Sequence, residues 1–111
     1  MFLRQTIHLL ALAMLLATFN IQAQVPEDAT WIDVRTPAEF AEGHIENAEL
    51  IPFDRIDIGI QQLGVEKSAP LYLYCGTGGR SGFAKKRLEA LGYTNVTNVG
   101  GLEDARALSG K

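Results

Sequence analysis

The chain has 111 residues, with 10 Lys and Arg against 13 Asp and Glu and a net charge of −3. This length allows one small domain, and mild acidity without a basic stripe gives no support for a nucleic-acid partner. A single cysteine excludes an internal disulfide, and no Cys/His cluster has the spacing of metal ligands. We therefore expect a one-domain protein that uses no metal or other cofactor and binds no nucleic acid.

The first 23 residues have the order of a secretory signal peptide. Arg4 precedes an apolar run over 9–19, and Ala23 places a small residue at a cleavage site. The run is shorter than the roughly 17–25 residues of a membrane span; an uncleaved anchor is the alternative. We expect cleavage after Ala23, export to the bacterial periplasm and no stable membrane association afterwards. Removing 23 of 111 residues leaves 88 and takes away one positive charge, so the mature net charge is −4.

Residues 28–109 are predicted to form one domain, which begins with a strand at 31–34. The helix after it has a clear start, because Thr36 can cap it, Pro37 suits its first position and Glu39 completes a capping box. Gly43 ends this helix. A short strand at 48–51 follows.

The second half of the predicted domain continues the alternation. Asp54 opens a helix whose apolar face is Ile56, Ile60 and Leu63 and which ends at Gly64. The strand at 71–74 is strongly apolar and is predicted to be central. The next helix ends at Gly92; its inward residues are Ala84, Leu88 and Leu91, and its outward residues are Lys85, Lys86 and Glu89. A strand at 93–99 follows. The last predicted element is an amphipathic segment with Leu102, Ala105 and Leu108 on one face. Alternating strands and helices predict an α/β fold with a mostly parallel sheet covered on both faces.

The only cysteine, Cys75, stands where a strand pattern passes into a helix pattern. Ligands gather at the carboxyl ends of parallel strands, and the backbone N–H groups of a helix start favour an anion there. The residues after it suit an anion-binding loop: flexible glycines Gly76, Gly78 and Gly79, hydroxyls on Thr77 and Ser81, and a cation on Arg80. Such surroundings lower a thiol pKa and make the sulfur nucleophilic. The alternative is a buried, inert cysteine beside a glycine-rich turn.

Two charged residues at the end of the first strand are supporting candidates. Asp33 and Arg35 are expected to brace the loop after Cys75 through hydrogen bonds, and an ordinary surface or interface ion pair is the alternative. His44 is expected to orient the turn after Gly43 rather than to act in catalysis.

The loop resembles the active-site loop of the rhodanese family, whose common form is Cys-x-x-Gly-x-Arg followed by Ser or Thr. Cys75, Gly78, Arg80 and Ser81 match that form. Further matching positions are Ile32-Asp33-Val34-Arg35, Pro37, Glu39-Phe40, Gly43-His44-Ile45, Asn47-Ala48, Ile51-Pro52 and Gly100-Gly101-Leu102. The exported single-domain format and the segment 31–35 look most like the periplasmic members of the phage-shock-protein-E type.

The resemblance implies a three-layer rhodanese-like fold and a thiosulfate-type sulfurtransferase. Cys75 would take the outer sulfur of a small donor anion, release sulfite and carry a persulfide to a thiophilic acceptor such as cyanide or a thiol. The residues of the loop, Gly76, Thr77, Gly78, Gly79, Arg80 and Ser81, would bind the substrate. No oligomeric state is predicted.

Two other functions fit the same fold. Phosphatase-like members and arsenate reductases use a Cys-x5-Arg loop, one residue longer than the Cys-x4-Arg spacing between Cys75 and Arg80, so the loop length favours sulfur transfer. A sulfur carrier without turnover, or a protein-interaction module, is the remaining alternative.

Overall fold

Four parallel strands form the centre of the molecule. The computed structural model describes residues 25–111, so the predicted signal peptide over 1–23 lies outside the described residues. The strands are β1 (Thr30–Asp33), β2 (Glu49–Leu50), β3 (Leu71–Cys75) and β4 (Val96–Gly101). Their order is β2-β1-β3-β4, and every neighbouring pair is parallel. The prediction that β3 is central is therefore confirmed.

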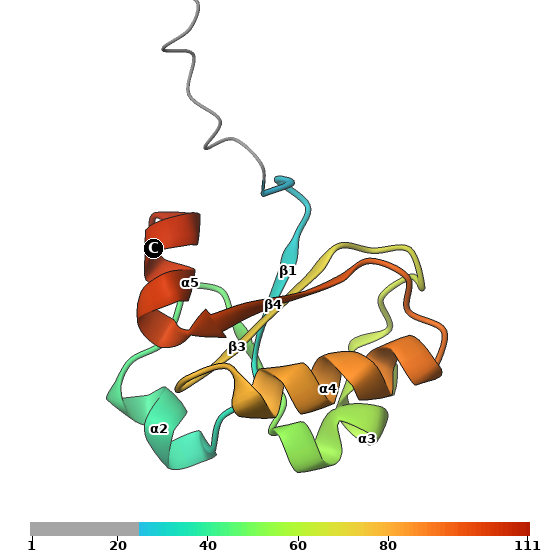
Figure 1. Ribbon diagram of the computed structural model, residues 1–111, viewed down its shortest axis with the longest axis horizontal. Helices are drawn as coiled ribbons and strands as arrows, with labels where there is room; N and C mark the ends of the chain where they lie inside the picture. Colours follow the sequence, from blue (N-terminus) through green and yellow to red (C-terminus); the bar gives the residue numbers. More distant parts are fainter. Residues whose placement is uncertain (1–24) are drawn as a thin grey trace, which may run out of the picture.

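Helices cover both faces of this sheet. They are α2 (Pro37–Glu42), α3 (Ile56–Leu63), α4 (Gly79–Ala90) and α5 (Leu102–Ser109), with a 3-10 turn, η1, at Phe53–Arg55. In Figure 1, α3 and α4 lie below the sheet, α5 lies above it, and α2 lies near the carboxyl ends of the strands. The predicted three-layer α/β fold is confirmed.

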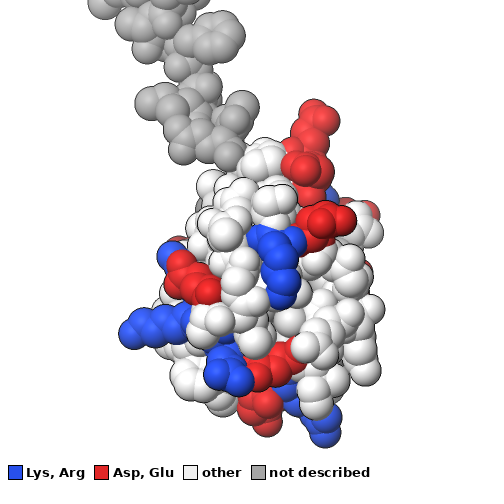
Figure 2. Space-filling view, turned by 90° about the vertical axis from the view of Figure 1, so that its right-hand side faces the viewer, with Lys and Arg blue, Asp and Glu red and all other residues white. Residues whose placement is uncertain are grey.

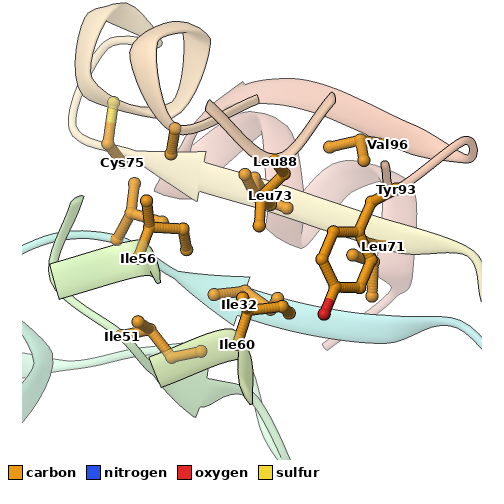
Figure 3. Close-up of a cluster of buried hydrophobic side chains, with 12 residues drawn as sticks. Ile32, Ile51, Ile56, Ile60, Leu71, Leu73, Cys75, Leu88, Tyr93 and Val96 are labelled. Atoms are coloured by element: carbon orange, nitrogen blue, oxygen red, sulfur yellow. The ribbon is translucent and has the colours of Figure 1, made fainter. Parts of the chain in front are cut away.

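The alternation of side chains along the strands divides the core into two parts. The α3/α4 face holds the larger cluster, which includes Ile32, Ile56, Ile60, Leu71, Leu73, Cys75, Ala84 and Leu88 (Figure 3). The α5 face holds Trp31, Ile45, Tyr74 and Ala105. Because successive residues of a strand point to opposite faces, Cys75 belongs to the α3/α4 face and Tyr74 to the other.

The predicted start and end of α2 are confirmed. Thr36 Oγ1 accepts a hydrogen bond from the N–H of Glu39 at 3.2 Å, and the Glu39 carboxylate accepts one from the N–H of Thr36 at 3.2 Å. The N–H of Gly43 donates to the carbonyl of Phe40. This reciprocal capping fixes the position of Glu39, whose carboxylate also binds Arg80 at the start of α4.

Three local predictions are wrong. Asp54 does not open α3, because the 3-10 turn of η1 comes first and the helix begins at Ile56. The last strand begins at Val96 rather than Tyr93, and it continues through Gly101. Leu108 does not face the core, since it is 43% exposed. The first two differences are shifts of one to three residues at element ends, which local pattern marks least precisely.

The surface is mixed in charge where Figure 2 draws it. That view shows the end of the molecule at the amino-terminal ends of the strands, and there acidic and basic side chains lie among neutral ones. Among residues 25–111, no helix has the length and apolar character needed to cross a membrane.

The α3 helix allows a matched test of this packing. Ile60 is fully buried and Ile58 is 56% exposed on the same helix. We expect Ile60→Ala to lower the free energy of unfolding by about 2–5 kcal/mol through lost burial and a cavity. The control, Ile58→Ala, is expected to change it by only about 0.5 kcal/mol. Urea unfolding measures both, and equal losses would show that α3 packs by another face.

Candidate active site

Cys75 is the last residue of β3, and the loop after it leads directly into α4. Its sulfur points toward the loop and the start of α4 (Figure 3). The N–H of Gly78 donates to Cys75 Sγ at 2.9 Å. Gly78 has φ 106°, a conformation that a residue with a side chain adopts only with strain. A glycine at this position therefore lets the backbone turn its N–H toward the sulfur.

The loop lies directly on the end of β4. A Cβ added to Gly101 would lie 2.3 Å from the carbonyl oxygen of Gly76, and one added to Gly78 would lie 3.3 Å from the Cα of Gly100. These contacts give a physical reason for the glycine pair at 100 and 101. Without side chains there, the two backbones approach closely enough to hold the loop over the sulfur.

The Cys75 residue is only 1% exposed, so the expected reactive sulfur is also a buried one. Burial raises the pKa of Cys75, but hydrogen bonds from the Ser81 hydroxyl and from the N–H groups of Ser81, Gly78 and Thr77 lower it more. The net result is a pKa of about 7. Cys75 is therefore buried, as the inert alternative predicts, and has the lowered pKa that the reactive alternative predicts, which favours the thiolate relative to an ordinary cysteine.

Arg80 faces α2 and forms a bidentate ion pair with Glu39. Its Nη1 and Nη2 atoms donate to the two carboxylate oxygens at 2.7 and 3.0 Å, and both side chains are about one-third exposed. Hydrogen bonds from Arg80 lower the pKa of Glu39 to about 2. The sequence analysis identified Glu39 as a capping residue and a family-matching position but not as the partner of Arg80, because nothing local links two residues 41 positions apart.

Asp33 and Arg35 form a buried ion pair, not a surface one. Arg35 Nη2 lies 2.7 Å from Asp33 Oδ2 and donates to the carbonyl of Gly43 at 2.7 Å, and Asp33 is fully buried. Asp33 pairs in register with Tyr74, so it lies on the sheet face opposite Cys75. The hydrogen bonds of the pair reach the end of α2 rather than residues 76–81. Any support for the loop is indirect, through α2.

The other predicted residues have more limited contacts. Gly79 and Thr77 are exposed, and Thr77 acts on Cys75 through its backbone N–H. His44 Nδ1 lies 2.8 Å from the carbonyl of Phe40, and the two rings are stacked at 3.6 Å between centroids. This agrees with the predicted role in the turn.

Asn98 of β4 is a site residue that the sequence reasoning missed. Its side chain contacts Ser81 Oγ at 2.6 Å and the carbonyl of Gly78 at 3.1 Å. An asparagine inside a predicted strand gives no local signal of such a role. Its register opposite Leu73, a residue of the α3/α4 face, is the feature that brings it to the loop.

The pH dependence of alkylation tests the state of the sulfur. We expect the rate with iodoacetamide to rise with pH around a midpoint near 7, because only the thiolate reacts. In urea the same cysteine should titrate near the ordinary value of about 8.5. Equal midpoints in folded and unfolded protein would contradict the hydrogen-bond argument.

Removing one partner of the buried pair tests its structural role. Asp33→Ala leaves Arg35 charged and uncompensated, and we expect it to cost about 3–5 kcal/mol of unfolding free energy. The double variant Asp33→Ala with Arg35→Met should lose clearly less. Both should keep the alkylation midpoint of Cys75, since the pair lies on the other face; a large shift in the midpoint of a folded variant would show direct coupling to the loop.

Comparison with known proteins agrees with this geometry. The rhodanese-like domain family matches residues 18–107. The chain is 39% identical over 74 residues to the thiosulfate sulfurtransferase PspE of Escherichia coli, covering 67% of this chain and 71% of that protein. It is 37% identical over 75 residues to a sulfurtransferase of Allochromatium vinosum, covering 68% of each chain. A solved structure described as a rhodanese with anions from E. coli superposes with a TM-score of 0.66 at 38% identity, covering 68% of this chain and 89% of that one. This chain belongs to the rhodanese-like domain family.

Proposed function

We propose that the protein is a thiosulfate-type sulfurtransferase in which Cys75 carries the transferred sulfur. In the first half-reaction, the Cys75 thiolate attacks the outer sulfur of thiosulfate. A new S–S bond forms, the old S–S bond breaks, and sulfite leaves with the electron pair. The products are a persulfide anion and sulfite, so the total charge of −3 on the reactants is conserved.

The second half-reaction returns the cysteine to its starting state. A thiophilic acceptor, such as cyanide or a thiolate, attacks the outer sulfur of the persulfide. With cyanide the products are thiocyanate and the Cys75 thiolate. Two separate half-reactions through a covalent intermediate predict ping-pong kinetics.

The single observation that carries this proposal is the set of hydrogen-bond donors around one buried sulfur. The Gly78 N–H lies 2.9 Å from Sγ, and the hydrogen bonds at Cys75 bring its pKa to about 7. The same donors would stabilise the anionic outer sulfur of a persulfide. Because neither half-reaction moves a proton, no general base is needed. The relatives named as sulfurtransferases support the same reaction.

Arg80 is the proposed contact for the donor anion. Its guanidinium is about one-third exposed and lies close enough to Cys75 for their charges to interact. Glu39, which remains ionised above a pKa of about 2, holds that guanidinium in place beside the loop. Fixed, planar N–H groups suit an oxyanion such as the sulfonate end of thiosulfate.

Site-directed variants test the assignment of roles. Cys75→Ser is expected to abolish thiocyanate formation from thiosulfate and cyanide, because it removes the carrier of the sulfur. Arg80→Ala should mainly raise KM for thiosulfate, by roughly ten-fold or more for a lost charge-assisted contact. Lys86→Ala, which removes an exposed cation from the same helix, is the control and should leave KM nearly unchanged. Full activity of Cys75→Ser would end the proposal.

Mass spectrometry separates turnover from simple sulfur carriage. After treatment with thiosulfate, wild-type protein should gain about 32 Da, one sulfur atom, on Cys75. Rapid loss of this mass on adding cyanide supports an enzyme. A persulfide that forms but does not discharge to cyanide or small thiols would instead indicate a carrier for a protein acceptor.

Export remains part of the proposal. The signal pattern over 1–23 predicts a mature protein that begins at Gln24 and acts in the periplasm. The intact mass of the protein recovered from the periplasmic fraction gives the cleavage site directly. A mass that includes residues 1–23 would favour the anchored form.

A further inference from the structure

Asn98 connects β4 to two of the residues whose hydrogen bonds act on the sulfur of Cys75. Its Nδ2 atom donates to the carbonyl of Gly78 at 3.1 Å. Its Oδ1 atom accepts from Ser81 Oγ at 2.6 Å and from the N–H of Gly100 at 3.1 Å. Gly78 and Ser81 are the residues whose N–H and hydroxyl groups contact Cys75 Sγ.

The Ser81 hydroxyl has one proton but several possible acceptors. Its oxygen lies 2.6 Å from Asn98 Oδ1, 3.1 Å from the carbonyl of Gly78 and 3.5 Å from Cys75 Sγ. A hydroxyl donates one hydrogen bond at a time, and its hydrogen rotates to suit. The distances favour donation to Asn98 while the sulfur is a neutral thiol. A thiolate is a stronger acceptor and draws the same proton to the sulfur.

The Ser81 hydroxyl can move its hydrogen bond from Asn98 to the sulfur at low cost. When Ser81 turns its hydrogen to the sulfur, Asn98 Oδ1 still accepts from the N–H of Gly100, so no acceptor is left without a partner. Its Nδ2 contact with Gly78 is unaffected and keeps the loop in position. The Asn98 amide itself therefore stays in place, through Gly78 and Gly100, in either state of the sulfur.

We propose that Asn98 is a positioning residue that accepts the hydrogen bond of the Ser81 hydroxyl beside Cys75 while the sulfur is neutral, and that the hydroxyl donates to the sulfur instead when the sulfur becomes charged. We expect Ser81 to donate in the same way to the anionic outer sulfur of a Cys75 persulfide, and this part rests on the proposed sulfurtransferase function. The thiolate part does not, because it concerns the resting cysteine alone.

Other charged groups near the loop come from three neighbouring elements. Arg80 of α4 is paired with Glu39 of α2, and Asp104 of α5 accepts from the N–H of Gly101 at 2.8 Å. The buried pair of Asp33 and Arg35 at the end of β1 lies on the opposite face of the sheet. Substitutions at Asn98 leave all of these groups unchanged in sequence, so a shift of the Cys75 titration reports on the local hydrogen bonds.

Two variants of similar size give opposite expectations. Asn98→Leu and Asn98→Asp both lose the Nδ2 donor to Gly78. The leucine also removes the nearest competing acceptor, so the Ser81 hydroxyl donates more readily to the sulfur and the alkylation midpoint should fall. The aspartate keeps a stronger acceptor and adds a negative charge, so the midpoint should rise. Below the wild-type midpoint, alkylation with iodoacetamide should be several-fold faster for the leucine variant and several-fold slower for the aspartate variant.

The Ser81→Ala background shows whether the effect passes through the hydroxyl. There, Asn98→Leu should no longer lower the midpoint. Asn95→Ala, at an exposed asparagine just before β4, is the control and should match wild type. Circular dichroism checks folding, and Asn98→Ala replaces the leucine variant if that one does not fold.

A merely structural role for Asn98 would shift both variants in the same direction, since both lose the contact with Gly78. Shifts in the same direction would overturn the inference. So would the absence of a shift in either variant, or an effect of Asn98→Leu that persists in the Ser81→Ala background. The readout is alkylation rather than turnover. If the protein proved to have no sulfurtransferase activity, the proposed function would be wrong, but the alkylation test of Asn98 would still decide this inference.

Discussion

The hydrogen bond from the N–H of Gly78 to the sulfur of Cys75 is the interaction on which the site depends. It requires a backbone conformation with positive φ, and it requires the loop to stay close to the sulfur. The second condition is met by the end of β4, where Gly101 lets the carbonyl of Gly76 approach. The end of β3, the loop, the end of β4 and the start of α4 therefore form one unit around the thiol.

Burial and hydrogen bonding act on Cys75 in opposite directions. An apolar setting next to Ile56 and Ala84 disfavours a charged sulfur, while N–H and hydroxyl donors favour it. The donors are largely backbone dipoles, which are fixed by the fold and carry no net charge. A sulfur held in this way is shielded from bulk solvent and still ionises near neutral pH. The same packing therefore both buries the sulfur and lowers its pKa.

Arg35 and Arg80 each form an ion pair with a carboxylate, one pair buried and the other partly exposed. Arg35 and Asp33 are buried on the α5 face, where they tie the end of β1 to the turn after α2. Arg80 and Glu39 lie at the partly exposed mouth of the loop. Because Glu39 also completes the cap of α2, the helix start fixes the carboxylate that in turn fixes Arg80. A local capping motif thereby contributes to the geometry of a site far away in the sequence.

The sequence by itself determined the alternation of strands and helices, the cap and end of α2, the glycine end of α3, the central strand before Cys75 and the glycine-rich loop between that strand and a helix. These features depend on residues within one or two turns of each other, so local pattern contains them. Only the tertiary structure decided that Asp33 and Cys75 lie on opposite faces, that Glu39 holds Arg80, and that Asn98 reaches Ser81. Each of these depends on the register between strands or on packing across the sheet. A bulge in β4 opposite Leu73 and Tyr74, for example, sets how the end of that strand meets the loop, and its effect on the register appears only when the two strands pair.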